Sequence, residues 1–523
     1  MNGWKNEAEG TWRRRDILKS VGLAAIVKAT AGWAAGSTAT QSFLPDVELA
    51  LTAEPGEARI LPGAPTQVWR YTGRVIKGPQ EALQPVPNSY LGPTLRLQRG
   101  QRVRIRFSNR LPNPSIVHWH GLDLPEEADG HPRRVVASGG SYLYEFTVTD
   151  PAGTYWYHPH PHMETGSQVY RGLAGLLIVE DPKEQALNLP AGQQELTWVI
   201  QDRRFDARNQ LVYASSRMDS VTGFLGDRVL VNGTERPQFA LASRVYRARI
   251  LNGSNARIYK LGWSDGTPVT VIGGQGGLLE APVTQPFVTL APAQRVDLWI
   301  DLRSRPVGSI LELRSVEFAA ADASVEMAGM MGGRGRGRGS MMMANSSALA
   351  QGGAVSLLSI RVARREEDNA ALPARLGPAV PAADAAAAAP TRRIMLDVQG
   401  MQQWTIDGRV FGMTDVADSE TVAAGSTHEW EFVNAGGPMG MQMAHPIHLH
   451  GRHFQVVGRS GGDPANTLRD GLIDRGWTDT VLVLPQESVR IRVTFSNHRG
   501  LYLYHCHILE HEDMGMMRNF RIV

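Results

Sequence analysis

Four His-x-His pairs constrain the fold of this 523-residue chain more than any other feature of its sequence. The pairs are His118/His120, His158/His160, His448/His450 and His505/His507. Side chains two residues apart on a β-strand project to the same face, so each pair directs two imidazoles to one side. Eight imidazoles presented in this way predict a shared cluster of two to four ions of a late transition metal, and copper accepts coordination by three imidazoles.

The four pairs form two copies of one pattern. Residues 153–160 and 500–507 both read G-x-Y-x-Y-H-x-H, and residues 116–121 align with residues 446–451 around H-x-H-G. No histidine occurs from Met163 to Thr427. The first and last parts of the chain are therefore predicted to be duplicates that build the cluster, while the middle part supplies no imidazole to it.

Short alternating runs of Val, Ile, Tyr and Arg, separated by Gly, Pro and Asn, predict many short antiparallel strands from about residue 45 onward. Residues 103–109, 247–252 and 429–434 are strand-like runs that each end in Asn, which indicates three similar β units in succession. Breaks in composition place these units at 45–185, 186–365 and 393–523, with an Ala- and Pro-rich linker at 366–392. A Met/Gly/Arg-rich insert at 319–350, within the second unit, is predicted to be mobile.

Cys506 is the only cysteine, so no intramolecular disulfide can form. It stands between the last two histidines of the cluster, and on a strand its thiol faces the opposite side from both imidazoles. The thiolate, the imidazoles of His445 and His511 and the thioether of Met516 are together the ligand set of a mononuclear blue-copper electron-transfer site. An inert buried thiol beside a methionine that fills the core is the alternative.

These motifs resemble those of three-domain multicopper oxidases of the bacterial laccase and copper-efflux oxidase type. The matching segments are H-W-H-G at 118–121, H-P-H at 158–160, H-P-I-H-L-H-G at 445–451 and H-C-H-I-L-E-H-E-D-M-G-M at 505–516. The resemblance implies an all-β protein of three consecutive cupredoxin-like Greek-key β-sandwich domains, with a trinuclear site clamped between the first and the third. It also implies four copper ions, of which one is type 1, one is type 2 and two are type 3.

The resemblance also implies which residues bind each copper. The type 1 ligands are His445, Cys506, His511 and Met516. The type 2 ligands are His118 and His448, and the type 3 ligands are His120, His158, His160, His450, His505 and His507. Such an enzyme would couple four one-electron oxidations of a reductant to the reduction of dioxygen to two waters, which requires four protons. Asp129 and Glu512 match positions that supply protons in the family, and a solvated loop acid is the alternative for each.

The reducing substrate is left open between two classes. Phenols, aromatic amines or similar organic donors would make the chain a laccase, whereas thioethers that gather Cu(I) would make it a cuprous oxidase of copper tolerance. The methionines of the insert favour Cu(I), with Met441 and Met443 before His445 as additional contacts. The insert departs from the copper-efflux pattern, however, because it precedes the last strand of the second unit and residues 440–444 contain no carboxylate. The remaining alternative is a non-catalytic copper-binding or structural protein of the same fold, and the complete ligand set argues against it.

The N-terminus resembles a bacterial twin-arginine export signal. Arg14 and Arg15 precede a weakly apolar run at 21–36 and small residues at 37–39, so residues 1–40 are predicted to direct export to the periplasm or the exterior. The apolar run is interrupted by Lys28 and is shorter than the roughly 20 residues that span a bilayer. No later stretch is long and apolar enough, so no stable membrane insertion is expected after the signal is removed.

The charge of the chain argues against a nucleic-acid partner. The formal net charge is +3, but residues 1–40 hold six basic and three acidic side chains, so the remainder is neutral on balance. A protein that neutralises phosphates would keep a basic excess in its folded part. We expect a monomer whose partners are dioxygen and a small reducing substrate, either phenolic or Cu(I).

Overall fold

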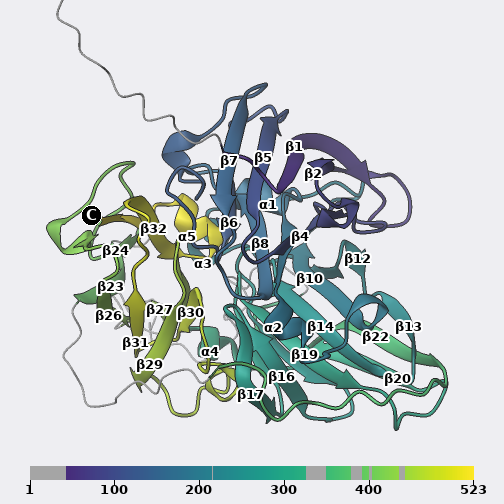
Figure 1. The fold of residues 1–523 in the computed structure, drawn as a ribbon. Helices are drawn as coiled ribbons and strands as arrows, with labels where there is room; N and C mark the ends of the chain where they lie inside the picture. Colours follow the sequence, from purple (N-terminus) through teal and green to yellow (C-terminus); the bar gives the residue numbers. More distant parts are fainter. Residues whose placement is uncertain (1–42, 215, 326–348, 379–391, 400–402, 435–441) are drawn as a thin grey trace, which may run out of the picture. The chain divides into compact units, whose positions relative to one another are not determined.

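The computed structural model describes residues 43–214, 216–325, 349–378, 392–399, 403–434 and 442–523. The predicted export signal, Met441, most of the Met-rich insert and much of the predicted linker lie outside these described residues. From Leu44 to Val523 the chain forms one unit built almost entirely of β-strands, which confirms the all-β expectation (Figure 1). No helix in the described ranges combines the length and the apolar composition needed to cross a bilayer.

Residues 47–180 form two sheets, with strand orders β2-β1-β5-β7 and β3-β4-β9-β8-β6. In β5, Val103, Ile105 and Phe107 are buried while the intervening arginines are exposed or half-buried, as the two-residue period of a strand requires. The strands are β1 (Val47–Ala58), β2 (Thr66–Lys77), β3 (Leu83–Gln84), β4 (Thr94–Gln98), β5 (Arg102–Asn109), β6 (Val117–His120), β7 (Ser141–Thr147), β8 (Gly153–Pro159) and β9 (Gly175–Glu180).

Residues 195–364 form a seven-stranded sheet, β12-β11-β10-β14-β19-β16-β17, and a five-stranded sheet, β13-β22-β20-β15-β18. Most buried apolar side chains of these strands pack into one core, separate from the core of residues 47–180. The strands are β10 (Glu195–Arg203), β11 (Arg228–Val231), β12 (Thr234–Glu235), β13 (Gln238–Ala242), β14 (Val245–Asn252), β15 (Tyr259–Trp263), β16 (Val269–Gly274), β17 (Gly277–Gln285), β18 (Val288–Leu290), β19 (Arg295–Asp301), β20 (Ile310–Ser315) and β22 (Val355–Arg364).

Residues 392–522 form two five-stranded sheets, β24-β23-β26-β31-β29 and β25-β33-β32-β28-β30. The strands are β23 (Arg392–Gln399), β24 (Gln403–Ile406), β25 (Thr421–Val422), β26 (Thr427–Val433), β28 (His445–Leu449), β29 (Phe454–Gly461), β30 (Thr480–Val483), β31 (Glu487–Thr494), β32 (Gly500–Cys506) and β33 (Met517–Ile522). A separate two-stranded sheet pairs β21 (Ser324–Val325) with β27 (Gln442–Met443). The α-helices are short: α1 (Thr165–Tyr170), α2 (Pro182–Gln185), α3 (Arg217–Thr222), α4 (Ala320–Ala323) and α5 (Leu509–Asp513).

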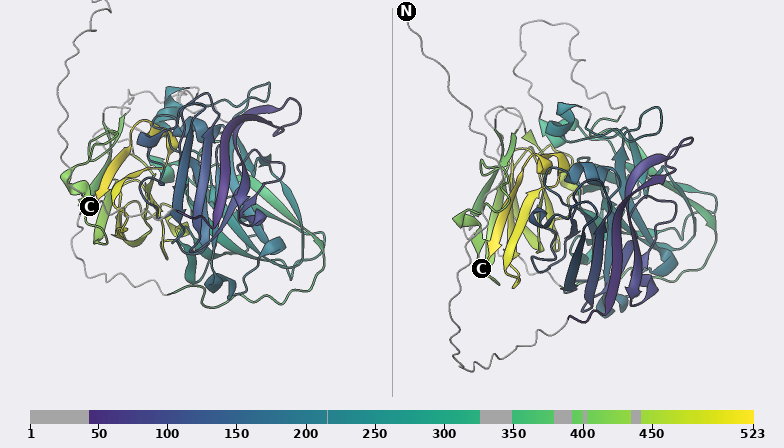
Figure 2. Two further views of the ribbon diagram at one scale, coloured as in Figure 1. Left: turned by 45° about the horizontal axis from the view of Figure 1, so that its top comes forward. Right: turned by 90° about the horizontal axis from the view of Figure 1, so that it is seen from above.

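The strands are not all antiparallel. Most neighbours run antiparallel as predicted, but each of the three stretches contains two parallel pairs. In the first stretch these are β1 with β5 and β4 with β9. In the second they are β10 with β14 and β13 with β22, and in the third β23 with β26 and β25 with β33. Alternation along a strand shows which face is buried but not the direction of its neighbour, so the sequence could not reveal these pairs. The two views in Figure 2 show the strands of each stretch side by side.

The three strand-to-Asn runs occupy equivalent places. They form β5, β14 and β26, which are the strands that pair in parallel with the first long strand of each stretch. Asn109 donates from Nδ2 to the carbonyl oxygens of Asn113 and Val136, and Asn252 donates in the same way to those of Arg257 and Leu290. A buried Asn at this position satisfies the backbone of the loops that follow the strand, which is why the repeat could be detected from sequence.

Candidate metal centre

The duplicated histidine motifs form two strand pairs with the same register. In the first, β6 pairs antiparallel with β8 and His118 lies opposite His158. In the second, β28 pairs antiparallel with β32 and His448 lies opposite His505. The sequence match between the two halves therefore extends to their hydrogen-bonded pairing.

The imidazoles of these two strand pairs converge, and all eight are buried. The ring of His118 stacks on that of His450 with centroids 3.8 Å apart, and the ring of His120 stacks on that of His448 at 3.6 Å. In each stack one ring comes from the first stretch and the other from the last. The eight side chains thus form one centre where these two stretches meet.

His118 and His448 direct lone pairs toward each other. Nδ1 of His118 donates to the carbonyl oxygen of Asp129 at 2.6 Å, and Nδ1 of His448 donates to the carbonyl oxygen of Asp479 at 2.8 Å. A neutral imidazole carries one N–H, so both Nε2 atoms are acceptors, although they lie only 3.3 Å apart. Two facing lone pairs in a buried site require a cation between or beside them.

The same conflict recurs at His450 and His505. Nδ1 of His450 donates to Oδ2 of Asp129 at 2.8 Å, and Nδ1 of His505 lies 3.1 Å from both the carbonyl oxygen of Cys506 and Oε2 of Glu512. The two Nε2 atoms therefore carry lone pairs, and they are 3.1 Å apart. A second cation is needed here.

The other four imidazoles present nitrogens without partners. Nδ1 of His158 donates to the carbonyl oxygen of Pro159, while its Nε2 has no partner. Nδ1 of His120, Nδ1 of His160 and both ring nitrogens of His507 also lack partners within the described residues. Buried polar atoms are rarely left unpaired, so this concentration is what residues that hold a metal ion would show.

Burial keeps these imidazoles neutral. It lowers the pKa of His118, His450 and His507 well below the usual range, and the neighbouring imidazoles lower it further. Burial also lowers the pKa of His160, to about 4, although the neighbouring Glu512 opposes the shift. Neutral imidazole is the form that binds a metal ion.

Cys506 builds a second site on the other face of β32. Its Sγ lies 3.4 Å from Nδ1 of His445 and 3.8 Å from Nδ1 of His511. Nε2 of His511 donates to the carbonyl oxygen of Val221 in α3 at 2.9 Å, so the Nδ1 lone pair faces the sulfur. Burial raises the pKa of the Cys506 thiol, and a bound metal would offset that shift by favouring the thiolate.

Met516 and Trp404 complete the surroundings of this site. Met516 is buried, and its carbonyl oxygen accepts from the amide of Cys506 at 3.1 Å, so the fold brings the predicted thioether residue beside the thiol. Trp404 stacks on His511 with centroids 4.6 Å apart and donates from Nε1 to the carbonyl oxygen of Val221. One thiolate and two imidazoles in a buried apolar setting suit copper.

Asp129 and Glu512 both lie at the histidine centre. Oδ2 of Asp129 accepts from His450, and its Oδ1 has no hydrogen-bond partner among the residues that the structure describes. Burial raises the pKa of Asp129 well above its usual range. Burial alone would also raise the pKa of Glu512, but the imidazoles of His160 and His505 hold it well below its usual range. The pKa values of the two carboxyl groups are thus shifted in opposite directions.

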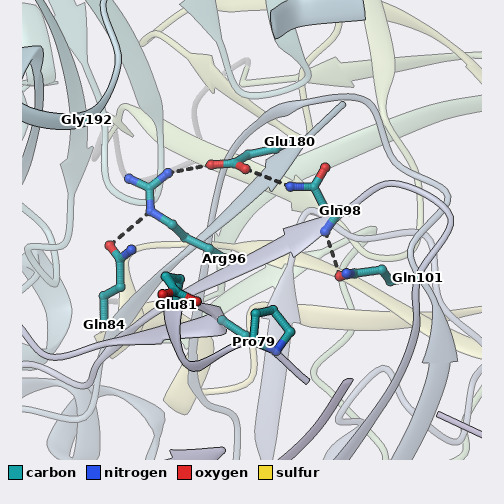
Figure 3. A pocket seen from close by; sticks show the side chains of 9 residues that line it. Pro79, Glu81, Gln84, Arg96, Gln98, Gln101, Glu180 and Gly192 are labelled. Atoms are coloured by element: carbon teal, nitrogen blue, oxygen red, sulfur yellow. Dashed lines mark hydrogen bonds and ion pairs between the residues drawn. The ribbon is translucent and has the colours of Figure 1, made fainter. Parts of the chain in front are cut away.

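An open cavity of about 510 Å³ lies apart from these side chains (Figure 3). Its lining contains Arg96, which donates to Glu180 at 2.7 Å and to Gln84 at 3.0 Å, and Gln98, which donates to the same glutamate. None of the described residues that line it is a histidine, cysteine or methionine. It does not belong to the metal centre.

Comparison with known proteins agrees with this geometry. Two family models described as "Multicopper oxidase" match residues 68–184 and 386–523. The chain is 32% identical over 433 residues to "Multicopper oxidase mco" of Staphylococcus aureus, covering 83% of this chain and 82% of the relative. The chain belongs to the multicopper oxidase family. It is also 28% identical to the laccase of Bacillus subtilis, covering 87% of this chain and 90% of the relative.

A solved multicopper oxidase structure extends the likeness to the fold. The crystal structure of McoA from Aquifex aeolicus is 34% identical, has a TM-score of 0.73, and covers 92% of this chain and 97% of that chain. Multicopper oxidases use type 1, type 2 and type 3 copper with dioxygen and a reducing substrate, and the chain is an oxidoreductase of this kind. The cupredoxin-like fold expected from the sequence is likewise confirmed.

Asp479 is the functional residue that sequence reasoning missed. It is fully buried immediately before β30, and its Oδ1 lies 3.0 Å from Nε2 of His120. Burial alone would raise its pKa, but the Arg295 guanidinium beside it holds that pKa well below the usual range. The only signal in the sequence was an acid preceding an aliphatic strand at 480–484, which does not by itself indicate a site.

Proposed function

We propose that this multicopper oxidase binds four copper ions through the twelve residues that its sequence motifs supply. His445, Cys506, His511 and Met516 would hold the type 1 copper, and His118 and His448 the type 2 copper. The type 3 pair would be held by His120, His158, His160, His450, His505 and His507. When bound, these ions supply one-electron acceptance at the type 1 site and four-electron reduction of dioxygen to water at the other three.

One observation carries this proposal: Cys506 occupies one face of β32 while its two sequence neighbours occupy the other. The sulfur lies among the imidazoles of the single-metal site, and the rings of His505 and His507 belong to the histidine centre. Adjacent residues of a strand are about 3.3 Å apart along its axis. The backbone therefore provides a short covalent path between the two sites.

The two buried carboxyl groups would supply and accept protons. Burial raises the pKa of Asp129 well above its usual range, which favours the protonated form, and its Oδ1 lies 3.7 Å from Nδ1 of His118. Glu512 is ionised and has both oxygens turned toward imidazoles, Oε2 toward His505 and Oε1 toward His160. This arrangement supports Asp129 as a proton donor, and Glu512 as a carboxylate that would take up a proton from solvent and pass it on to the centre.

The substrate we favour is a small organic reductant such as a phenol or aromatic amine, and one relative of the chain is a laccase. A specific contact keeps Cu(I) as the second candidate. Ser324 of β21 lies opposite Met443 of β27, and the amide of Ala444 donates to the carbonyl oxygen of Ala323 at 2.7 Å. The first residues of the insert, Ala323 and Ser324, thus lie beside Met443 and Ala444, which directly precede His445.

We further propose that the sheet pairs correspond to domains at 45–185, 186–365 and 393–523. We also propose that the protein is a monomer and that Arg14 and Arg15 direct its export to the periplasm or exterior. Replacing both arginines by lysine should retain the protein inside the cell, as fractionation would show. The loaded enzyme is expected to sediment as a single chain.

Anaerobic copper reconstitution followed by oxygen-uptake assays tests the main proposal. The loaded protein should contain four coppers per chain, be blue, and consume oxygen with a phenol. Parallel assays with Cu(I) rank the two substrate classes. Fully metallated protein that is colourless and consumes no oxygen with either donor would exclude the proposal.

A further inference from the structure

Arg295 lies where the three sheet-forming stretches meet. It begins β19 in the histidine-free middle stretch, and its side chain is fully buried. Nη1 and Nη2 donate to Oδ1 and Oδ2 of Asp479, in the last stretch, at 2.8 and 2.5 Å. Nε donates to the carbonyl oxygen of Thr154, in the first stretch, at 2.9 Å. One guanidinium therefore joins all three stretches.

The remaining donors of Arg295 are also satisfied. Nη2 donates to the carbonyl oxygen of Gln275 at 3.1 Å and Nη1 to that of Ala293 at 3.2 Å. All five N–H groups have acceptors, so the planar fork has one orientation. A carboxylate bound to it in bidentate fashion is fixed equally well.

Asp479, held in place by Arg295, accepts hydrogen bonds from two imidazoles of the histidine centre. Its Oδ1 accepts from Nε2 of His120 at 3.0 Å, which leaves the unpartnered Nδ1 of that ring free for a metal. Its carbonyl oxygen accepts from Nδ1 of His448 at 2.8 Å, which leaves Nε2 free. The same residue thus sets the tautomer of one ring from the first stretch and one from the last.

The space around this pair excludes any side chain at position 121. A Cβ on Gly121 would lie 2.6 Å from Oδ2 of Asp479 and 2.9 Å from Nη2 of Arg295, and the φ of this residue is +93°. The glycine after the first His-x-His pair therefore lets the ion pair pack directly against the backbone that carries His120.

We propose that Arg295 is a positioning residue for the trinuclear copper site. Through Asp479 it fixes the orientation and tautomer of His120 and His448, so the middle stretch completes a centre to which it gives no ligand. This inference rests on the proposed function, since it concerns the same copper ligands. Removing a partner that orients a metal-bound histidine typically costs about 10- to 100-fold in metal affinity or activity.

The test compares Arg295→Met and Arg295→Lys with Arg249→Met in the full-length protein loaded with copper alone. Arg249 is a matched control, because it is a buried arginine of the middle stretch that pairs with Glu195 and Asp297 and contacts Thr154, but touches none of the twelve ligands. Copper per chain, blue absorption and the type 2 electron paramagnetic resonance signal are measured after dialysis against a chelator, together with kcat and KM for oxygen.

Arg295→Met should keep the blue type 1 site while its other coppers are retained about 10- to 100-fold more weakly. Copper retention in Arg295→Lys should lie between that of Arg295→Met and that of wild type, because lysine keeps the charge but not the forked guanidinium. Arg249→Met should keep four coppers and wild-type kcat. Equal copper retention in Arg295→Met and wild type, or equal loss in Arg249→Met, overturns the inference. Should Arg295→Met not fold, unaltered copper retention in Arg295→Lys overturns it as well.

A copper-free measurement separates this inference from the proposed function. In protein labelled with ¹⁵N-histidine, His120 should carry its proton on Nε2, and Arg295→Lys should shift or broaden this signal. An unchanged signal counts against the inference even if the enzyme is active. A wild-type protein that binds no copper but shows the expected tautomer would contradict the proposed function alone.

Discussion

Nδ1 of His511 lies 3.8 Å from Sγ of Cys506 and is held in that direction by the bond from Nε2 of the same ring to the carbonyl oxygen of Val221. The ligand set of the single-metal site is thus oriented by α3 of the middle stretch as well as by β32 and α5. Copper binding at this site should depend strongly on the sulfur of Cys506, because its thiolate is the one soft anionic ligand of the predicted set.

Replacing Cys506 by serine should remove the type 1 copper and leave the other three. The hydroxyl is nearly isosteric but is a poor ligand for copper at neutral pH. We expect about three coppers per chain, no blue absorption and loss of substrate oxidation, with the type 2 resonance signal retained. Copper analysis and absorption spectra check this result. A serine variant that oxidises a phenol at the wild-type rate would remove Cys506 from the electron path.

Replacing Asp129 by asparagine should slow oxygen reduction without removing copper. The amide oxygen can still accept from Nδ1 of His450, but the group no longer exchanges a proton. General acid catalysis contributes about 10²- to 10⁴-fold, so turnover should fall by roughly 100-fold or more while blue absorption persists. Oxygen uptake by Asp129→Asn is compared with that of Glu127→Gln, an exposed neighbouring acid. Equal rates in the two variants would show that Asp129 supplies no proton.

The sequence predicted those parts of the site that repeat or alternate. The His-x-His pairs and the buried Asn109 and Asn252 stood out because the same local requirement recurs in several stretches. Asp479 and Arg295 did not, because each is a single charged residue in or beside an ordinary strand and becomes informative only when the fold brings together two residues 184 positions apart. The parallel strand pairs were hidden for a related reason, since hydrophobic alternation carries no direction.

Asp150 should make the stability of the protein dependent on pH. It is buried, Oδ1 accepts from the amide of Asp123 at 3.0 Å, and Oδ2 has no hydrogen-bond partner in the described part of the chain. Burial raises its pKa from 3.8 to about 7. Because the folded-state pKa is the higher one, its stabilising contribution is complete below about pH 4 and is lost as the pH rises toward 7.

Asp150→Asn should therefore become more stable than wild type as the pH rises. The neutral amide keeps an acceptor for the Asp123 amide and is never ionised. The advantage should grow by about 1.4 kcal/mol per pH unit, or roughly 3 kcal/mol between pH 5 and pH 7. Denaturant unfolding of both copper-free proteins at pH 5 and pH 8 measures it. The same stability difference at both pH values would show that Asp150 stays ionised in the folded state.

Deleting residues 326–343 should separate the two substrate classes. The strand pair between β21 and β27 holds the residues before this segment next to those before His445. Methionine thioethers placed near His445 would bind Cu(I) but would have no role in the oxidation of an aromatic donor. If Cu(I) is the substrate, the deletion abolishes Cu(I) oxidation and leaves phenol oxidation intact or raised, and replacing the six methionines by leucine at constant length has the same effect. If both activities survive in both variants, the insert has no role in supplying electrons, and the enzyme is a laccase whose donors approach the type 1 site without it. The leucine variant is the deciding control, because a loss seen only on deletion would reflect the altered chain length and not the missing sulfur.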